Sequence, residues 1–203
     1  MAKLISADLT NNKLCVLEYT TTNRRMIDIN PDSFDARVVS HTYTDMGKII
    51  FQEPITVIGL RAFEDCSILT SVTIPDSVTT IESAAFKNCG SLTSITIPDG
   101  VTKIGWSVFY DCSKLKSITI PDGVTEIGGF TFNGCSSLTS ITIPDSVTSI
   151  GYRAFYGCSS LKKVEICNEK GCVNISYNAF GFDVKVTYLG KAAQPKPKQE
   201  VKE

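Results

Sequence analysis

A cysteine returns every 23 residues in this chain, at Cys66, Cys89, Cys112, Cys135 and Cys158. The residues around it repeat almost unchanged: residues 115–137 read LKSITIPDGVTEIGGFTFNGCSS, and residues 138–160 read LTSITIPDSVTSIGYRAFYGCSS. A period of about 20–29 residues is typical of solenoids, in which each repeat is one unit stacked on the next. The spacing therefore predicts a repeat solenoid, and it directs the search for function to the positions where the repeats differ.

Apolar residues recur at seven positions of each repeat. In the copy that begins at residue 92 they are Leu92, Ile95, Ile97, Val101, Ile104, Val108 and Phe109. The alternating β-branched residues around Ile95 favour a short strand with one buried face. Pro98 ends that strand because proline has no N–H for the ladder, and Asp99-Gly100 then favours a turn.

The second half of the repeat predicts a second strand and a turn. The strand is expected at Val101–Ile104, and Gly105 closes it. We expect residues 106–112 to form a short helical turn that buries Val108 and Phe109. One unit of this size cannot offset its own ordering entropy, so neighbouring repeats must share buried faces and the two ends need caps.

The consensus of the repeat is similar to a known family. Leu-x-x-Ile-x-Ile-Pro-x-x-Val-x-x-Ile-Gly-x-x-Ala-Phe-x-x-Cys, which recurs over residues 46–189, resembles the BspA-type leucine-rich repeats, a 23-residue class of bacterial surface proteins and some parasite proteins. The resemblance implies a mostly β, right-handed leucine-rich-repeat solenoid with a parallel sheet. It also implies a surface or secreted protein of the adhesion and protein-binding kind, with no catalytic residues and no cofactor.

The repeat divides the chain into three parts. Residues 1–45 lack it and are predicted to form an N-terminal cap, a β-hairpin with strands at Leu14–Tyr19 and Met26–Ile29; a separate interaction module is the alternative. Residues 46–189 are the solenoid of about six 23-residue repeats, of which the first is degenerate. Residues 190–203 are rich in proline and lysine and almost free of apolar side chains, which predicts a disordered tail.

The five repeated cysteines are predicted to be buried free thiols. Equivalent residues of stacked strands lie about 4.8 Å apart, whereas the Cβ atoms of a disulfide lie about 3.5–4.5 Å apart. A metal site needs ligands that converge on one point, and a line of thiols does not offer one. Because free cysteine is among the most buried residue types, we expect each thiol to fill a small slot in the core.

The pattern decays after Leu161, which predicts the C-terminal cap of the array. Cys167 replaces the proline that ends the strand, and two residues are inserted before Ile175. Cys172 then falls on the core position that Val147 holds in the preceding repeat, and we expect it to fill that position. A disulfide between Cys167 and Cys172 in the inserted loop is the alternative.

Composition and the scarcity of reactive groups argue against several function classes. His41 is the only histidine, and a Cys–His nucleophile would need it beside a reactive thiol such as Cys15, so no enzyme is predicted. The 20 basic and 21 acidic residues leave a net charge of −1 and form no basic stripe, so no nucleic-acid partner is predicted. No apolar run of about 18 residues exists, so no membrane insertion is predicted.

Aspartates also recur once per repeat, at Asp76, Asp99, Asp122 and Asp145. We interpret them as turn formers, because an aspartate side chain bonds nearby backbone groups in turns. A calcium-binding ladder is the alternative, but one carboxylate per repeat supplies too few oxygen ligands. No metal site is therefore predicted.

Aromatic residues gather at the variable positions of three consecutive repeats. The candidate partner-binding residues are Trp106, Tyr110, Phe130, Tyr152, Arg153 and Tyr156, all within the segments that follow the strand-ending glycines. Tryptophan, tyrosine and arginine dominate the hot spots of protein interfaces. The exposed strand positions, by contrast, carry almost uniform threonine. Packing of some of these rings between repeats is the alternative interpretation.

These observations favour a non-catalytic, adhesin-like module that binds a protein or glycan partner through variable residues on a constant scaffold. The alternative is a structural component of a larger cellular or viral assembly, with the protein a monomer or part of that assembly. The first 19 residues contain no 7–15-residue apolar run and no small-residue cleavage site. A surface or secreted location, as the resemblance implies, and an intracellular or assembly-associated one therefore both stay open.

Overall fold

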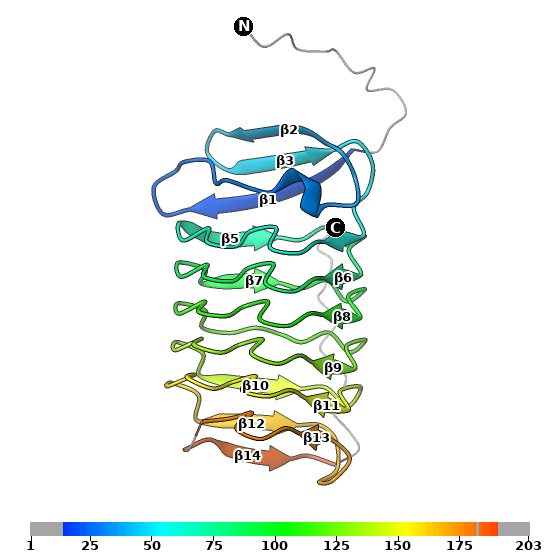
Figure 1. Cartoon of the computed structure of the whole chain (residues 1–203), viewed down its shortest axis with the longest axis vertical. Coiled ribbons are helices and arrows are strands. Elements are labelled where there is room, and N and C mark those ends of the chain that lie inside the picture. Colours follow the sequence, from blue (N-terminus) through cyan, green and yellow to red (C-terminus); the bar gives the residue numbers. More distant parts are fainter. Residues whose placement is uncertain (1–13, 182, 191–203) are drawn as a thin grey trace, which may run out of the picture.

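The computed structural model describes residues 14–181 and 183–190. It is a mostly β solenoid of about six turns, and neighbouring turns pair in parallel, which confirms the predicted fold class. In Figure 1 the repeats stack along the long axis, with an antiparallel cap at the N-terminal end. Repeats one to six begin at residues 46, 69, 92, 115, 138 and 161. The predicted tail lies outside the described residues except for Gly190.

The strands form two columns that follow the axis of the solenoid. The first column, which we call the strand face, contains β5 (Leu69–Thr73), β7 (Ser94–Thr96), β10 (Ser140–Ile143), β12 (Lys163–Ile166) and β14 (Lys185–Tyr188). The second column contains β4 (Val57–Ile58), β6 (Thr80–Ile81), β8 (Lys103–Ile104), β9 (Glu126–Ile127), β11 (Ser149–Ile150) and β13 (Asn174–Ile175). Val72 pairs with Ile95, 23 residues on, so the pairing register is the sequence period.

The hydrogen-bonded ladder is interrupted in repeat four. Among the described residues no strand is assigned at 115–121, so β7 and β10 are edge strands of separate sheets, and β8 does not pair with β9. Ile118 and Ile120 nevertheless stay buried, with 8% and 2% of their surface exposed. The apolar pattern therefore holds through this repeat without the ladder, because burial of side chains does not require strand hydrogen bonds.

Residues 106–112 bury Val108 and Phe109 as predicted, but they form tight turns and no helix. Ser107 and Asp111 have φ angles of 56° and 54°, and a left-handed residue interrupts a right-handed helix. The N–H groups of Ser107, Phe109 and Asp111 donate to carbonyl oxygens of repeat four at 2.8–3.0 Å. The equivalent bonds recur in repeats one to four. We call this edge, residues 60–66 and their equivalents in the later repeats, the turn face.

A stack of phenylalanine rings runs through the core beside the turn face. Its members are Phe63, Phe86, Phe109, Phe132, Phe155 and Phe180. Neighbouring ring centroids lie 5.0–5.7 Å apart, and the ring planes differ by 12° or less. All rings but the last are fully buried. Such ring pairs stabilise a core by about 0.5–1.5 kcal/mol beyond their buried area.

The cysteines from Cys89 to Cys158 bond to this stack through their thiols. Each donates its S–H to the carbonyl oxygen of the phenylalanine one repeat back, as Cys135 does to Phe109 at 3.1 Å. The same carbonyl of Phe109 accepts the N–H of Cys112, in its own repeat, at 3.2 Å. The prediction of buried free thiols is confirmed for all five repeats. A cysteine fits here because it combines a small apolar volume with a weak donor.

The N-terminal cap is a three-stranded antiparallel extension of the strand face. Its strands are β1 (Cys15–Thr21), β2 (Val38–Tyr43) and β3 (Gly47–Phe51), and the sheet order is β2-β3-β1-β5-β7. Ile49 and Phe51 are buried, as their place in the degenerate repeat predicts. However, β1 lies between β3 and β5, so these residues pair antiparallel with β1 and not in parallel with repeat two.

The prediction of a strand at Met26–Ile29 is wrong. This segment instead crosses the end of the core, where the N–H of Ile27 donates to Tyr19 Oη at 3.4 Å. The carbonyl oxygen of Asp28 accepts the S–H of Cys66 at 3.1 Å. It takes the place of the phenylalanine carbonyl of a preceding repeat, because no repeat precedes repeat one. Because these backbone groups bond the end of the core, they do not form a hairpin ladder with β1.

The single described helix, the 3₁₀ turn η1 (Pro31–Ser33), leads into the residues that close the stack. Phe34 follows it and meets Phe63 edge-on, with ring centroids 5.9 Å apart and planes at 75°. The carboxylate of Asp35 accepts the N–H groups of Thr56 and Val57 at 3.0 Å and 3.2 Å and also the Thr56 hydroxyl. Burial alone would raise the pKa of Asp35, but these hydrogen bonds outweigh it and lower that pKa.

The C-terminal end differs from the prediction at one cysteine. Cys172 is exposed, and Val173, with 7% of its surface exposed, takes the core position instead. The two inserted residues produce a turn in which Cys172 N–H donates to Glu169 at 3.1 Å and Gly171 has a φ of 95°, so Cys172 points outward. Cys167 is buried, and both thiols are free.

We expect Phe109→Ala to lower the free energy of unfolding by about 3–5 kcal/mol, because it empties a fully buried ring position between two stacked neighbours. Phe180→Ala should cost less, since that ring is partly exposed and stacks on Phe155 alone. Urea unfolding followed by circular dichroism measures both. Equal losses would contradict a stacked core with a weaker end.

We expect Asp35→Asn to lower the free energy of unfolding by about 1 kcal/mol at pH 7, because an amide accepts the cap hydrogen bonds more weakly. The folded-state pKa of Asp35 is lowered, so its stabilisation is present above the unfolded value of about 3.9 and is lost as the pH falls through the folded value. The difference between the two proteins should therefore shrink as the pH falls below about 5. A constant difference in urea unfolding over this range would contradict the role of the carboxylate.

Candidate functional site

One position of the turn face has a left-handed backbone in all six repeats. Its residues are Arg61, Ala84, Ser107, Phe130, Arg153 and Asn178, with φ between 53° and 59°. A left-handed residue other than glycine costs roughly 1–3 kcal/mol, and bulky side chains are rare there. The chain nevertheless places a phenyl ring and two guanidinium groups at this position and never glycine. We call it the display position, since backbone geometry alone does not account for its side chains.

Trp106, the only tryptophan, directly precedes a display position and is 58% exposed. Its indole lies over Gly128 and Gly129 of the next repeat. A Cβ atom added at Gly128 would lie 2.9 Å from Trp106 Cδ1, and one at Gly129 would lie 3.4 Å from Cε3 and Cζ3. Because the two glycines have no side chains, one face of the indole packs directly on their backbone, and much of the rest of the ring is exposed to solvent.

A shallow hollow of about 490 Å³ lies beside Trp106 on the turn face. Its lining residues are Leu60, Arg61, Ser83, Ala84, Lys87, Trp106, Ser107, Tyr110 and Phe130. Three of them, Trp106, Tyr110 and Phe130, are sequence-predicted site residues. The hollow spans repeats one to four, so a ligand seated in it would touch side chains that differ from repeat to repeat.

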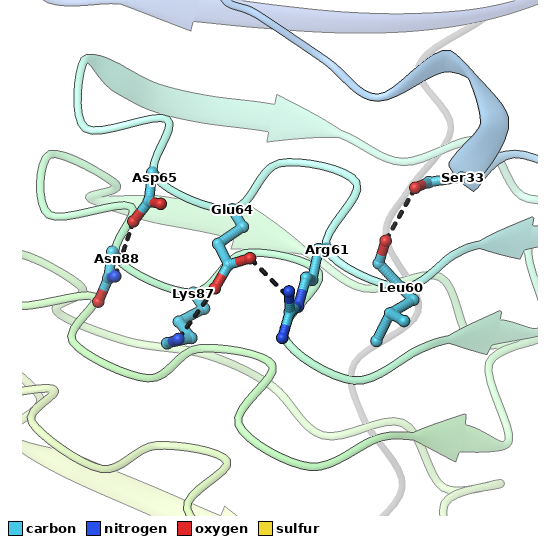
Figure 2. Close-up of polar contacts among 7 residues, drawn as sticks. All are labelled: Ser33, Leu60, Arg61, Glu64, Asp65, Lys87 and Asn88. Carbon is cyan, nitrogen blue, oxygen red and sulfur yellow. Dashed lines mark hydrogen bonds and ion pairs between the residues drawn. The ribbon is translucent and has the colours of Figure 1, made fainter.

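The polar residues at the N-terminal side of the hollow bond to one another, as Figure 2 shows. Glu64 accepts Lys87 Nζ at 2.9 Å and Arg61 Nε at 3.3 Å, and Asn88 donates to Asp65 at 2.7 Å. The hydrogen bond and the charge of Glu64 raise the pKa of Lys87. These charges are therefore largely neutralised within the chain, which leaves the apolar walls as the open part of the hollow.

Arg153 lies at the other end of the aromatic row, between two tyrosine rings. Its guanidinium carbon is 5.1 Å from the ring centroid of Tyr152 and 4.9 Å from that of Tyr156, within the range of cation–π contacts. Phe130 joins this group to the hollow, since its ring meets Tyr152 edge-on at 5.4 Å. The two tyrosines are 39% and 38% exposed.

The structure thus brings all six sequence-predicted residues to one face. Phe130 and Tyr152 also pack against each other across repeats, as the alternative interpretation expected. Binding by these residues stays a prediction. The sequence analysis did not select Leu60, Arg61 and Lys87 of the hollow, nor Tyr177, which is 79% exposed and follows Tyr152 in repeat six. Their variability between repeats was the available signal.

A second hollow, of about 670 Å³, lies on the strand face over repeats four to six. Its lining is mostly the repeated serine, threonine, isoleucine, proline and aspartate of the strands and turns, with Lys163, Glu165 and Cys167 at one end. Lys163 and Glu165 form an ion pair at 2.6 Å. Although this hollow is larger, most of its side chains are the same in each repeat, so it offers a ligand less to distinguish.

The buried thiols are poor nucleophiles. Burial raises the pKa of Cys66 and Cys158 to about 12 and raises that of Cys112 and Cys135 well above the usual range. A thiol protonated at neutral pH and enclosed in the core attacks no substrate. The repeated cysteines therefore act in packing.

The structure does not bring His41 and Cys15 together. β3 lies between β1 and β2, and His41 Nε2 bonds Tyr19 Oη at 2.7 Å. Burial lowers the pKa of His41. Within residues 14–181 and 183–190, no group of three or more His, Cys, Asp and Glu side chains could hold a metal ion. No helix of the same residues is long and apolar enough to cross a membrane.

Comparison with protein families gives one match over most of the chain. The model of the BspA-type leucine-rich repeat region matches residues 39–162 and 107–189, with six copies. No match was found among curated protein sequences.

Several solved structures have a similar fold. A leucine-rich repeat protein of T. pallidum is 29% identical with a TM-score of 0.55, and the match covers 72% of this chain and 71% of that one. A leucine-rich cell surface protein of Faecalibacterium prausnitzii is 32% identical with a TM-score of 0.51, and 86% of this chain and 55% of that one are covered. A leucine-rich repeat protein of Eubacterium ventriosum is 29% identical with a TM-score of 0.55, and 66% and 36% are covered. This chain therefore spans only part of the longer two.

We expect Cys172 alone to react with N-ethylmaleimide in the folded protein, because the other seven cysteines are buried. Mass spectrometry of the intact protein should show one adduct without urea and eight in urea. The Cys172→Ser variant should show none without urea. Several rapid adducts on the folded protein would contradict the buried thiol ladder.

Proposed function

The chain belongs to the BspA-type leucine-rich repeat family, and from that premise we propose that it is a non-catalytic, adhesin-like module that binds a protein or glycan partner through its turn face. The observation that carries the proposal is the contrast between its two surfaces. The strand face repeats the same threonines and serines, whereas the turn face gathers Trp106, Tyr152 and Tyr156 with 38–58% of their surface exposed.

The shape of the turn face supports a macromolecular partner more than a small molecule. The hollow beside Trp106 is shallow and open, and it continues through Phe130 to the Tyr152–Arg153–Tyr156 group. Sites for small molecules are typically deeper and bury most of their ligand. A row of rigid aromatic side chains over several repeats matches the composition of protein-binding hot spots.

A second candidate function is a structural part of a larger assembly, and the N-terminal cap favours it. Within the described residues β2 pairs only with β3, so its other edge is open. Val39 and Met46 at this end are 49% and 37% exposed, and β2 carries no lysine or proline of the kind that blocks edge pairing. In this case the cap, and not the turn face, would contact the neighbouring subunit.

The proposed function is tested by substitution with residues that the scaffold already carries at the same position. Trp106→Ser copies Ser83, and Phe130→Ser copies Ser107, so both variants should stay folded. Val39→Ser on the cap and Thr142→Ala on the strand face are the controls. Each protein is presented as bait to a panel of extracellular proteins and glycans and to native cell extract.

We expect a partner that binds the unaltered chain and the two controls but binds each turn-face variant at least 10-fold more weakly. Loss of one hot-spot aromatic typically costs about 2 kcal/mol or more, which corresponds to a factor of this size. Binding that only Val39→Ser weakens would favour the assembly function. Binding that only Thr142→Ala weakens would move the site to the strand face.

A further inference from the structure

We propose that the group Tyr152–Arg153–Tyr156 binds the carboxylate of an aspartate or glutamate side chain on a protein partner, which makes acidic peptide segments the ligand class of the turn face. This inference rests on the proposed function and adds the chemistry of the ligand to it. It is carried by an arginine that the chain itself leaves without a counter-charge.

Arg153 is unpaired among the described residues. None of the ion pairs includes it, and its side chain forms no hydrogen bond. Its Nε is fully buried and has no acceptor, whereas the residue as a whole is partly exposed. The two Nη atoms are not buried, so their N–H donors face solvent and are free to bond a ligand. The rings of Tyr152 and Tyr156 contact the guanidinium group of Arg153 and restrict its position.

The chain contains its own comparison for this residue, because Arg61 occupies the display position of repeat one. Three residues after Arg61 stands Glu64, which binds Arg61 Nε at 3.3 Å. Three residues after Arg153 stands Tyr156, which offers an aromatic face in place of a carboxylate. With the same backbone conformation, φ 58° and 53°, one arginine is neutralised internally and the other is left for an external anion.

Arg153 has two local costs, and among the described residues its guanidinium meets only the two tyrosine rings in return. Its backbone is left-handed, and its buried Nε–H lacks the acceptor that such donors normally have. The scaffold accepts serine and asparagine at the equivalent positions, as Ser107 and Asn178 show, and neither side chain would bury a charge. Strain of this kind points to a function for the side chain that carries it.

The chemistry of the group favours a carboxylate presented by a protein. A guanidinium fork matches a planar carboxylate with two parallel hydrogen bonds, and flanking rings restrict the fork and limit the entropy lost on binding. The adjoining hollow has apolar walls at Leu60, Ala84 and Phe130, which suit an apolar neighbour of the acidic residue. The polar side chains at the far end of this hollow, Glu64, Lys87, Asp65 and Asn88, already bond one another. We therefore take a protein carboxylate as the ligand and treat an acidic sugar as the competing outcome of the test.

Nuclear magnetic resonance of the Arg153 Nε–Hε group tests the proposal directly. The chain has five arginines, so the signals of an ¹⁵N-labelled sample are few, and Arg153→Ser identifies the one to follow. The probes are tetraglutamate and tetraglutamine peptides with both ends blocked and tetragalacturonate as a carboxylate on a sugar. Arg61→Ser is the matched control, since it removes the paired arginine at the same position. Arg153→Asn, which copies Asn178, is a second variant should the serine variant fold poorly.

We expect tetraglutamate to shift the Arg153 signal saturably, at least 10-fold more tightly than tetraglutamine, with loss of the response in 0.5 M salt. Arg61→Ser should change the affinity less than twofold, and in Arg153→Ser and Arg153→Asn the shifts of neighbouring amides should vanish. No saturable shift, an equal response to tetraglutamine, or a response retained without Arg153 would overturn the proposal. A response to tetragalacturonate alone would overturn the protein carboxylate in favour of a glycan.

Failure of this proposal is distinguishable from failure of the proposed function. A partner that Trp106→Ser weakens and Arg153→Ser leaves unchanged would refute the carboxylate site and retain the turn face as the interaction surface. A partner that both variants bind as tightly as the unaltered chain would refute the proposed function itself.

Discussion

The phenylalanine carbonyl shared by two cysteines is the contact on which the rest of the structure depends. The carbonyl of Phe109 accepts the N–H of Cys112 in its own repeat and the S–H of Cys135 in the next, at 3.2 Å and 3.1 Å. It therefore closes one turn and fixes the next turn over it. An insertion between Phe109 and Cys135 would separate donor from acceptor in the core, where an unmade hydrogen bond costs about 1–3 kcal/mol. The 23-residue period keeps this donor and acceptor in register from Cys89 to Cys158.

This arrangement separates the residues that build the scaffold from those that face outward. The core and the ladder use the apolar positions and the cysteine, which vary little between repeats. The display position has a backbone conformation that few side chains favour, and it carries arginine, alanine, serine, phenylalanine and asparagine in different repeats. Variation at this position alters the surface without altering the stack, which is the property that an interaction module on a repeat scaffold needs.

The sequence predicted the parts of the fold that repetition specifies. Burial of Val108, Phe109 and the five thiols followed from the period, because a position repeated at fixed spacing has the same environment each time. Prediction failed in the predicted helical turn at residues 106–112, where Ser107 and Asp111 are left-handed, and at places where the chain is not periodic. The segment Met26–Ile29 has strand-like residues, yet its backbone covers the end of the core, and Cys172 points outward because the inserted turn shifts the core position to Val173. The first outcome depends on a contact between segments far apart in the sequence, and the second on the conformation of a local turn that does not recur in the other repeats.

In the candidate site, too, the sequence specifies the position of a residue in the repeat but not the side chains that surround it. Arg61 and Arg153 stand at equivalent positions of their repeats, but the sequence alone does not separate their roles, since the difference lies in what each guanidinium touches. Glu64 bonds the first, whereas two tyrosine rings enclose the second without neutralising its charge. An anion supplied from outside would therefore meet an arginine without a counter-charge at Arg153, whereas at Arg61 it would compete with Glu64. Comparison between repeats thus distinguishes two arginines at the same position by the side chains that each one contacts.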